Sequence, residues 1–319
     1  MSTSVHLFGH DPATYRPHAV HDDQRSYPET NCYTDILIEL LHARGDEPLA
    51  MLGSNVRADF EGDQWTFFKP SLPDVELLFG VDIHEMQPYR PLPLQIGELL
   101  QEKRTLTVEV DAWYLPDTVA TSYRTEHVKT SIAVEAIDRD AERLRYYHNR
   151  SLFELGGEDY RGLFRIGAGP YDELAPYTEL VRFDMGARLQ GNDLRAAALH
   201  LLRGHLSRLP DTNPFLRFGE RLEADLPAVL AGDVDEFHRY AFATIRMAGA
   251  GFELTASHVD WLLGTTAAVT SAGMMRIVEG SKLLGFKLAR RRPFDPGPIV
   301  GQLASAWDEA MAALVHAAG

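Results

Sequence analysis

The segment Val128–Asn149, VKTSIAVEAIDRDAERLRYYHN, contains two apolar runs separated by a charged stretch. The runs, Val128–Ile137 and Arg143–His148, are rich in β-branched and aromatic residues, which favour strands, and Asp138–Ala141 between them suits a turn. An earlier run, Thr105–Tyr114 (TLTVEVDAWY), begins with strict apolar and polar alternation. Together these runs predict an antiparallel sheet made of a strand, a long loop and a hairpin.

A helix is predicted before this sheet and a series of helices after it. Cys32–Arg44 (CYTDILIELLHAR) has apolar residues at helical spacing, and Gly45 suits a helix C-cap. The second half of the chain has helical periodicity in Asp193–Ser207, Phe215–Leu230, Val234–Gly249, Ser257–Thr270, Gly273–Leu288 and Val300–Ala318. We expect a boundary at Gly167–Pro170. The sequence thus predicts an α+β domain over residues 1–166 and an all-helical domain over residues 167–319.

Composition narrows the classes of function. The 319 residues carry a formal net charge of −15, which argues against a nucleic-acid partner because phosphate contacts need a basic surface. No segment approaches the roughly 20 apolar residues of a membrane helix, and the first 25 residues lack a signal-peptide pattern. The single cysteine excludes an intrachain disulfide and fits a cytoplasmic protein. We expect no membrane association.

Motifs for bound groups are missing. The sequence has no Gly-rich phosphate loop, and its one cysteine excludes a metal site built from cysteines. His18, His21, Asp22 and Asp23 cluster near the N-terminus, but no helical pair of ligands accompanies them. We expect neither a bound cofactor nor a metal.

Cys32 has two interpretations. A lone cysteine is most often a buried structural residue. However, Cys32 stands in the first turn of the predicted helix, after the polar residues Glu29–Asn31. The N-terminus of a helix favours the thiolate, which is the nucleophilic form. Cys32 is therefore a candidate nucleophile.

A nucleophilic cysteine needs a base and a group that orients the base. His127 lies where the loop enters the second predicted strand, and Asn149 follows the end of the third. In an antiparallel pair, the start of one strand lies beside the end of the next, so we expect His127 and Asn149 to be neighbours. Each residue alone is more simply a loop or turn residue. Together with Cys32 they predict a Cys-His-Asn arrangement of papain type.

This element order resembles a known family. A helix that begins with Cys32, the strand end Val110–Pro116 (VDAWYLP) and a loop with His127 before a hairpin look like the papain-like acyltransferases related to the butirosin-biosynthesis acyltransferase. The resemblance covers about Asp22 to Gly157, and those enzymes also carry a C-terminal helical region. More narrowly, the chain resembles a bacterial family of uncharacterised function whose members occur near amino acid:carrier-protein ligases. The motifs Asn-Cys-Tyr-x-Asp and His-Asn-Arg-Ser-Leu-Phe-Glu-Leu-Gly-Gly-Glu-Asp mark this family.

The resemblance implies acyl transfer from the phosphopantetheine thioester of a carrier protein to an amine, on a small molecule or a protein. Cys32 would accept the acyl group, His127 would act as base and acid, and Asn149, or less simply His148, would orient His127. Two departures stand out. Butirosin-type enzymes usually have Asp where Asn149 stands, and they have Gly and His around the cysteine, where this chain has Thr30 and Asn31.

Supporting roles are expected for three further residues. Gln24, by analogy with the papain pattern, or Asn31 could donate a hydrogen bond to an oxyanion, as could the backbone N–H of Cys32. Asp111, at a strand end, is expected to lie near the site, where it would contact the reacting residues and not the substrate.

Two other functions remain open on the sequence. The same triad would serve a cysteine hydrolase, either peptidase or thioesterase, and a catalytically inactive module could simply bind a carrier protein. The basic run that ends in Arg290, Arg291 and Arg292 is most simply the solvated end of a helix. Carrier proteins are acidic, so the same run is a candidate docking patch for one.

Overall fold

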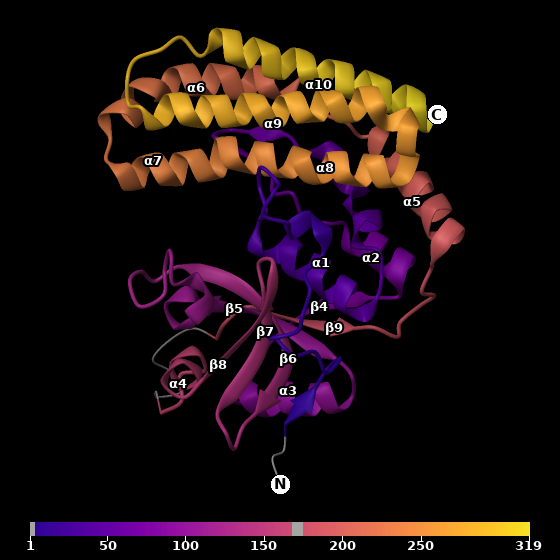
Figure 1. Cartoon of the computed structure of the whole chain (residues 1–319), viewed down its shortest axis with the longest axis vertical. Coiled ribbons are helices and arrows are strands. Elements are labelled where there is room, and N and C mark those ends of the chain that lie inside the picture. Colours follow the sequence, from indigo (N-terminus) through magenta and orange to yellow (C-terminus); the bar gives the residue numbers. More distant parts are fainter. Residues whose placement is uncertain (1–3, 168–174) are drawn as a thin grey trace. The chain divides into compact units, whose positions relative to one another are not determined.

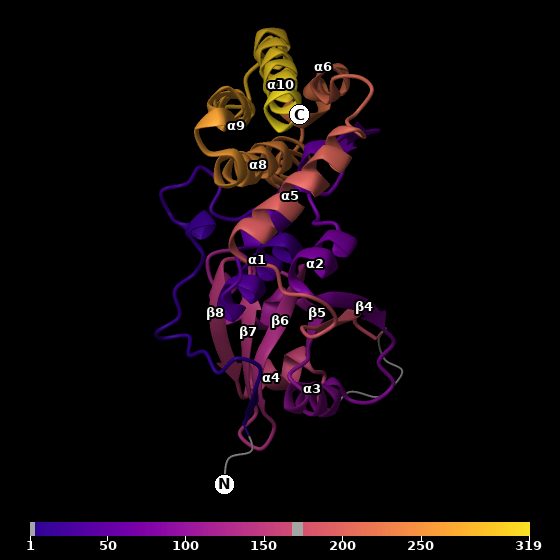
Figure 2. The ribbon, with the colours of Figure 1, turned by 90° about the vertical axis from the view of Figure 1, so that its right-hand side faces the viewer.

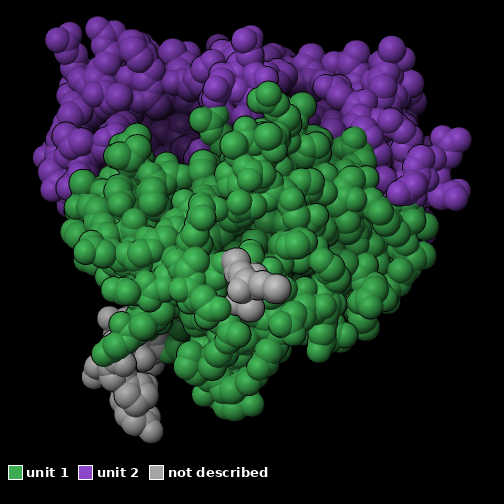
Figure 3. All heavy atoms as spheres, turned by 60° about the horizontal axis from the view of Figure 1, so that its bottom comes forward, with its two compact units in different colours: residues 1–19, 32–48, 72–189 green, residues 20–31, 49–71, 190–319 purple. Residues whose placement is uncertain are grey.

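The structure, a computed structural model, describes residues 4–167 and 175–319. Figures 1 and 3 show that the chain forms two compact units. The sheet unit comprises Met1–Ala19, Cys32–Pro48 and Leu72–Leu189, and the helical unit comprises Val20–Asn31, Leu49–Ser71 and Gln190–Gly319. Each unit therefore combines three stretches of sequence. Of the boundary expected at Gly167–Pro170, residues 168–170 lie outside the described residues.

The sheet unit is built on an antiparallel sheet, as predicted. Its seven strands follow the order β4-β9-β5-β6-β7-β8, and β1 pairs with β6 at one end. The strands are β1 (Val5–His6), β4 (Asp82–Met86), β5 (Thr105–Asp111), β6 (Lys129–Asp138), β7 (Arg143–His148), β8 (Ser151–Gly156) and β9 (Thr178–Arg182). The sequence pattern located β5, β6 and β7. The predicted first strand ends sooner than expected, because residues 112–114 form a 3-10 turn capped by the Asp111 side chain.

Helices pack against both central and edge strands of this sheet. They are α1 (Cys32–Arg44), α2 (Leu72–Phe79), α3 (Leu92–Gln101) and the short α4 (Glu158–Leu163). Both α1 and α3 pack against β6, which is buried at every residue after Lys129. Burial of successive residues means that both faces of this strand are covered. Figure 2 shows β5 to β8 running side by side below α1.

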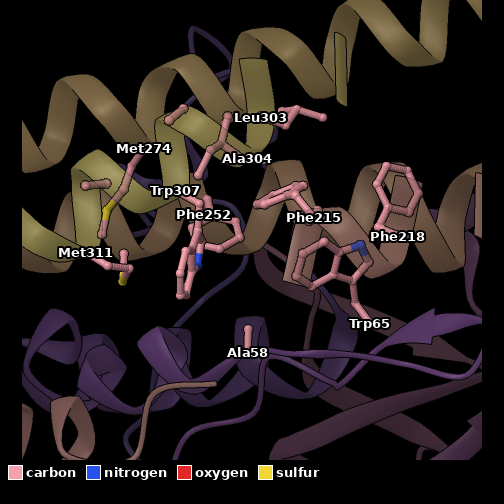
Figure 4. Close-up of a cluster of buried hydrophobic side chains, with 14 of the residues drawn as sticks. Ala58, Trp65, Phe215, Phe218, Phe252, Met274, Leu303, Ala304, Trp307 and Met311 are labelled. Atoms are coloured by element: carbon pink, nitrogen blue, oxygen red, sulfur yellow. The ribbon is translucent and has the colours of Figure 1, made fainter. Parts of the chain in front are cut away.

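The helical unit is built of helices, as the sequence predicted, although neither Val234–Gly249 nor Ser257–Thr270 forms one helix of its own. The helices are α5 (Gly191–Leu206), α6 (Pro214–Ala231), α7 (Val234–Ala241), α8 (Met247–Leu263), α9 (Ala268–Ala289) and α10 (Gly297–Ala318). A small hairpin, β2 (Phe60–Glu61) and β3 (Gln64–Trp65), belongs to the same unit. Figure 4 shows aromatic side chains from the hairpin and the helices in one core, with Trp65 beside Phe215 and Phe218.

Two of the gaps between the predicted helices, Gly249 to Ser257 and Thr270 to Gly273, are helical in the structure. Gly251 lies within α8. Only glycine fits there, because the ring of Phe68 occupies the space that a Cβ would need. Gly273 is in α9, where a Cβ would lie 2.8 Å from the Cβ of Ala310 on α10. The break between α8 and α9 comes instead at Gly264, whose φ of +57° suits glycine. Close packing against Phe68 and Ala310, rather than a break in the helix, explains the glycines at positions 251 and 273.

Candidate functional site

His127 and Asp111 form a hydrogen-bonded pair at one end of the sheet unit. Asp111 is the last residue of β5 and lies opposite Lys129, the first residue of β6, so the loop residue His127 comes next to it. Nδ1 of His127 lies 2.6 Å from Oδ2 of Asp111. A carboxylate only accepts hydrogen bonds, so Nδ1 carries the hydrogen and a neutral ring has its lone pair on Nε2. The ring is thereby set up as a proton acceptor.

The surroundings of this pair fix its orientation without burying it. The other Asp111 oxygen, Oδ1, accepts the backbone N–H of Trp113 at 3.0 Å. The Trp113 indole stacks on the His127 ring, with centroids 4.5 Å apart and planes 8° apart. The His127 side chain is nevertheless 67% exposed. Its Nε2 makes no hydrogen bond to any residue in the described ranges.

His148 has the opposite surroundings. Its side chain is 2% exposed, and its Nδ1 lies 2.5 Å from Oδ2 of Asp117. Its Nε2 lies 2.8 Å from Oγ1 of Thr130, and the other Asp117 oxygen accepts the Tyr146 hydroxyl at 2.5 Å. Burial, followed by the Asp117 charge, raises the pKa of Tyr146, so this hydroxyl remains a donor. Both ring nitrogens of His148 are occupied, which leaves no atom to orient His127.

Asn149 does not lie at the end of a strand beside His127. It is in the two-residue turn between β7 and β8, where His148 pairs with Ser151, and its φ is +45°. Continuing the β6–β7 register places Asn149 near Ser131, roughly 13 Å along the strand from His127. The expected neighbour differs because β5, and not β7, ends beside His127. Asp111 holds the position expected of Asn149.

Cys32 lies where the sequence placed it. It is the first residue of α1 and is partly exposed. It belongs to the same compact unit as His127, and α1 packs against β6, the strand that begins two residues after His127. The Cys32 thiol has no hydrogen-bond partner among the residues the structure describes.

The backbone before Cys32 is held by side chains of the helical unit. Arg246 donates to the carbonyls of Thr30 and Glu29, both at 2.8 Å. The Glu253 carboxylate accepts the backbone N–H groups of Ser26 at 3.0 Å and Tyr27 at 2.8 Å. We refer to residues 26–31 as the strap. The chain continues from the strap directly into Cys32.

The two side chains expected to stabilise an oxyanion are placed differently from each other. Asn31 is buried, and its Nδ2 donates to the carbonyl of Phe68 at 3.0 Å, so part of its donor capacity is used within the helical unit. Gln24 is exposed, and its backbone N–H donates to the Asp22 carboxylate in a surface turn. Neither arrangement identifies Gln24 or Asn31 as the hydrogen-bond donor to an oxyanion. The backbone N–H of Cys32 remains the simplest candidate.

The three arginines of the basic run have separate surroundings. Arg290 ends α9 and its guanidinium lies over the Phe286 ring, 5.4 Å from the centroid. Arg291 is partly buried and donates to the carbonyl of Leu230 at 3.4 Å. Arg292 is exposed. Only Arg290 and Arg292 are therefore fully presented to a partner.

Other possible sites contain none of the predicted residues. A groove of about 150 Å³ in the sheet unit is lined by residues of α3 and the neighbouring strands, among them Arg90 and Glu98, which pair with each other. Within residues 4–167 and 175–319, no three His, Cys, Asp or Glu side chains gather as a metal site requires. None of the helices in these ranges combines the length and apolar content that a membrane crossing needs.

Comparisons with known proteins cover both halves of the chain. The model of the DUF1839 N-terminal domain matches residues 16–183, and the model of the DUF1839 C-terminal domain matches residues 191–316. No curated protein matches the chain.

Proposed function

The chain belongs to the DUF1839 family, and on that premise we propose that it is a cysteine acyltransferase with Cys32 as nucleophile, His127 as base and acid, and Asp111 as the residue that orients His127. The observation that carries the proposal is the His127–Asp111 pair. A carboxylate on Nδ1, an aromatic ring against one face and a mostly exposed side chain are what a general base requires.

The proposed fold type is papain-like. A partly exposed cysteine that begins a helix, followed by an antiparallel sheet with the histidine at a strand start, supports this assignment. The relation to butirosin-type acyltransferases rests on the sequence resemblance alone. Those enzymes usually have Asp as the third residue, and Asp111 removes one of the two departures noted from the sequence.

The proposed reaction has two halves. His127 takes the thiol proton of Cys32, and the thiolate attacks the carbonyl carbon of the carrier-bound thioester. The C–S bond to phosphopantetheine then breaks, and the leaving thiolate takes the proton from His127. In the second half, an amine attacks the acyl-Cys32 thioester and gives its proton to His127. The bond between carbon and Cys32 breaks, and the departing thiolate recovers the proton.

The backbone N–H of Cys32 would donate to the oxygen of each tetrahedral intermediate. The strap supports this role because Arg246 and Glu253 fix the main chain directly before the cysteine. Preorganised backbone donors at such a position contribute by costing no reorganisation during the reaction.

The test uses the fact that Cys32 is the only cysteine. The protein is incubated with glycyl N-acetylcysteamine thioester, and the covalent adduct is followed by intact mass. We expect a hydroxylamine-labile adduct that maps to Cys32 and is absent in Cys32→Ala. An unmodified wild-type protein, or an equal adduct in Cys32→Ala, would overturn the proposal.

A second measurement separates transfer from hydrolysis. The acyl-Cys32 protein is isolated, and loss of the adduct is followed with and without an added primary amine such as putrescine. Transfer predicts that the amine accelerates the loss and appears as its N-acyl product. Loss to free acid at a rate that the amine does not change would identify a cysteine hydrolase instead.

A further inference from the structure

One side of α9 presents apolar and cationic side chains together. The α9 face, as we define it, consists of Lys282, Leu283, Phe286, Lys287 and Arg290, which lie along one stripe of the helix. Phe286 is 59% exposed and Leu283 42% exposed. The opposite side of the same helix, with Ile277, Leu284 and Leu288, is buried in the core of the helical unit. The exposed apolar side chains are therefore additional to those that α9 needs for packing.

Three of the five residues that define this face are cationic, and one acidic residue, Glu279, lies in the same stripe one turn before Leu283. Lys287 and Arg290 are exposed, and Arg290 lies over the Phe286 ring. Nζ of Lys282 forms an ion pair with the Glu279 carboxylate, 3.7 Å away, which leaves Lys287 and Arg290 as the cations of the face that are not paired with Glu279. The whole chain carries a net charge of −15, so an acidic partner is repelled by most of its surface. A local cluster of cations around apolar side chains marks the place where such a partner would bind.

The α9 face also adjoins the strap. Nζ of Lys282 donates to Oγ of Ser26 at 3.3 Å. Burial raises the pKa of Tyr27, the next strap residue, to about 12, and its ring lies against Gly249 of α8. The strap ends at Asn31, the residue before Cys32. A partner on the α9 face would thus contact a helix that donates a hydrogen bond to the first residue of the strap, the segment that leads to Cys32.

We infer that the α9 face docks the acidic carrier protein of the proposed reaction through an amphipathic helix. The inference rests on the proposed function for the identity of the partner. A helix with apolar residues at i and i+4 can pack along Leu283 and Phe286 while flanking carboxylates meet Lys287 and Arg290. The site differs from the run Arg290–Arg292, because the apolar anchors lie within α9 and Arg291 is bonded to Leu230.

The experiment compares two acyl donors. One is an acidic holo acyl carrier protein that bears a glycyl thioester on its phosphopantetheine, and the other is glycyl N-acetylcysteamine thioester, which needs no docking. The docking variant is Lys287→Glu/Arg290→Glu. Its control is Arg161→Glu/Arg221→Glu, which makes the same charge change on exposed arginines outside α9 that pair with Glu142 and Asp225.

We expect the docking variant to slow Cys32 acylation from the carrier protein by about tenfold at low salt, and less at high salt. Acylation from the small thioester should be unchanged in both variants, and the control should stay within about twofold for both donors. Phe286→Ser should also slow the carrier reaction, but with the salt dependence of the wild type. Equal rates for docking variant and control, or a slower reaction with the small thioester, would overturn the inference.

Two further results distinguish carrier docking from failure of the proposed reaction and from self-association of the chain. If neither donor acylates wild-type Cys32, the proposed function is wrong. Docking is then tested by itself, by measuring the affinity of fluorescently labelled holo carrier protein for the docking variant and for its control. If light scattering shows a dimer that Phe286→Ser converts to a monomer, the α9 face binds a second copy of the chain, and the carrier inference is wrong.

Discussion

Two histidine–aspartate pairs lie on the same sheet in opposite environments. His127 and Asp111 sit at the exposed start of β6, with side chains 67% and 34% exposed. His148 and Asp117 are 2% and 5% exposed. Both pairs join Nδ1 to a carboxylate at about hydrogen-bond distance, 2.6 Å and 2.5 Å. The residue types and the distance within a pair therefore do not distinguish their roles. Two other properties do: how far the pair is buried, and whether the second ring nitrogen of the histidine is hydrogen-bonded.

In the buried pair, His148 and Asp117, both ring nitrogens and both carboxylate oxygens have hydrogen-bond partners. Burial of polar groups is tolerated only when they are hydrogen-bonded, and here Thr130 and Tyr146 occupy the remaining ring nitrogen and carboxylate oxygen. The exposed pair leaves Nε2 of His127 for a substrate. The pair with an unused nitrogen is thus suited to proton transfer, while the saturated pair is suited to stabilising the sheet.

The largest effect is expected for His127→Ala. This variant removes the proposed base for Cys32, so the rate of Cys32 acylation by the small thioester should fall by about 10³-fold. Its free energy of unfolding should fall by only about 0.5–1.5 kcal/mol, since the side chain is mostly exposed and its main packing contact is the Trp113 ring. Single-turnover acylation and urea denaturation measure the two quantities.

His148→Ala is the control, and it should reverse this pattern, with a loss of stability and a nearly wild-type acylation rate in the folded protein. A rate loss in His148→Ala as large as that in His127→Ala would contradict the assignment of roles.

The second effect is on stability. Asp117→Ala leaves His148 and Tyr146 buried without their acceptor, and breaking a buried pair in this way costs about 3–5 kcal/mol. Hydrogen exchange at the amides of β6 and β7 should speed up. Asp111→Ala, the matched change in the exposed pair, loses the cap on Trp113 and should cost only about 1 kcal/mol. Similar costs for the two variants would show that burial does not separate the pairs.

The sequence predicted the elements of the site better than their pairing. The helical spacing in α1 and the β-branched residues of β6 predicted those elements, and with them the positions of Cys32 and His127. Asp111 was visible as a strand-end residue, but which strand flanks β6 on the side of His127 is a tertiary property that one sequence does not contain. The partners of His148 and the role of Gly251 depend in the same way on residues distant in the chain.

A third effect concerns a histidine that is buried without a carboxylate partner among the described residues. His258 is fully buried and its Nδ1 donates to the carbonyl of Leu49 at 2.7 Å. Burial is the main cause that lowers the pKa of His258 from 6.5 to about 4. Between these values the unfolded chain binds a proton that the folded chain does not, so stability is complete above pH 6.5 and falls as the pH drops toward 4. The loss should be about 3 kcal/mol.

His258→Gln, which keeps a neutral donor, should flatten this pH dependence, and urea denaturation at several pH values measures it. His148→Gln offers the comparison with a buried histidine that has a carboxylate. An unchanged slope in His258→Gln would assign the acid sensitivity to other groups.

The smallest effect tests the stacking that distinguishes the exposed pair. Trp113 covers one face of the His127 ring, and such aromatic contacts contribute about 0.5–1.5 kcal/mol. Trp113→Ala keeps the backbone N–H that Asp111 accepts, so it removes the stacking while leaving the hydrogen bond to Nδ1 possible. The acylation rate should fall by about three- to tenfold. Trp113→Phe should recover most of the rate, because a flat ring is retained. If Trp113→Ala instead matched His127→Ala, the indole would take part in binding or chemistry, and the exposed pair would depend on more than Asp111 for its orientation.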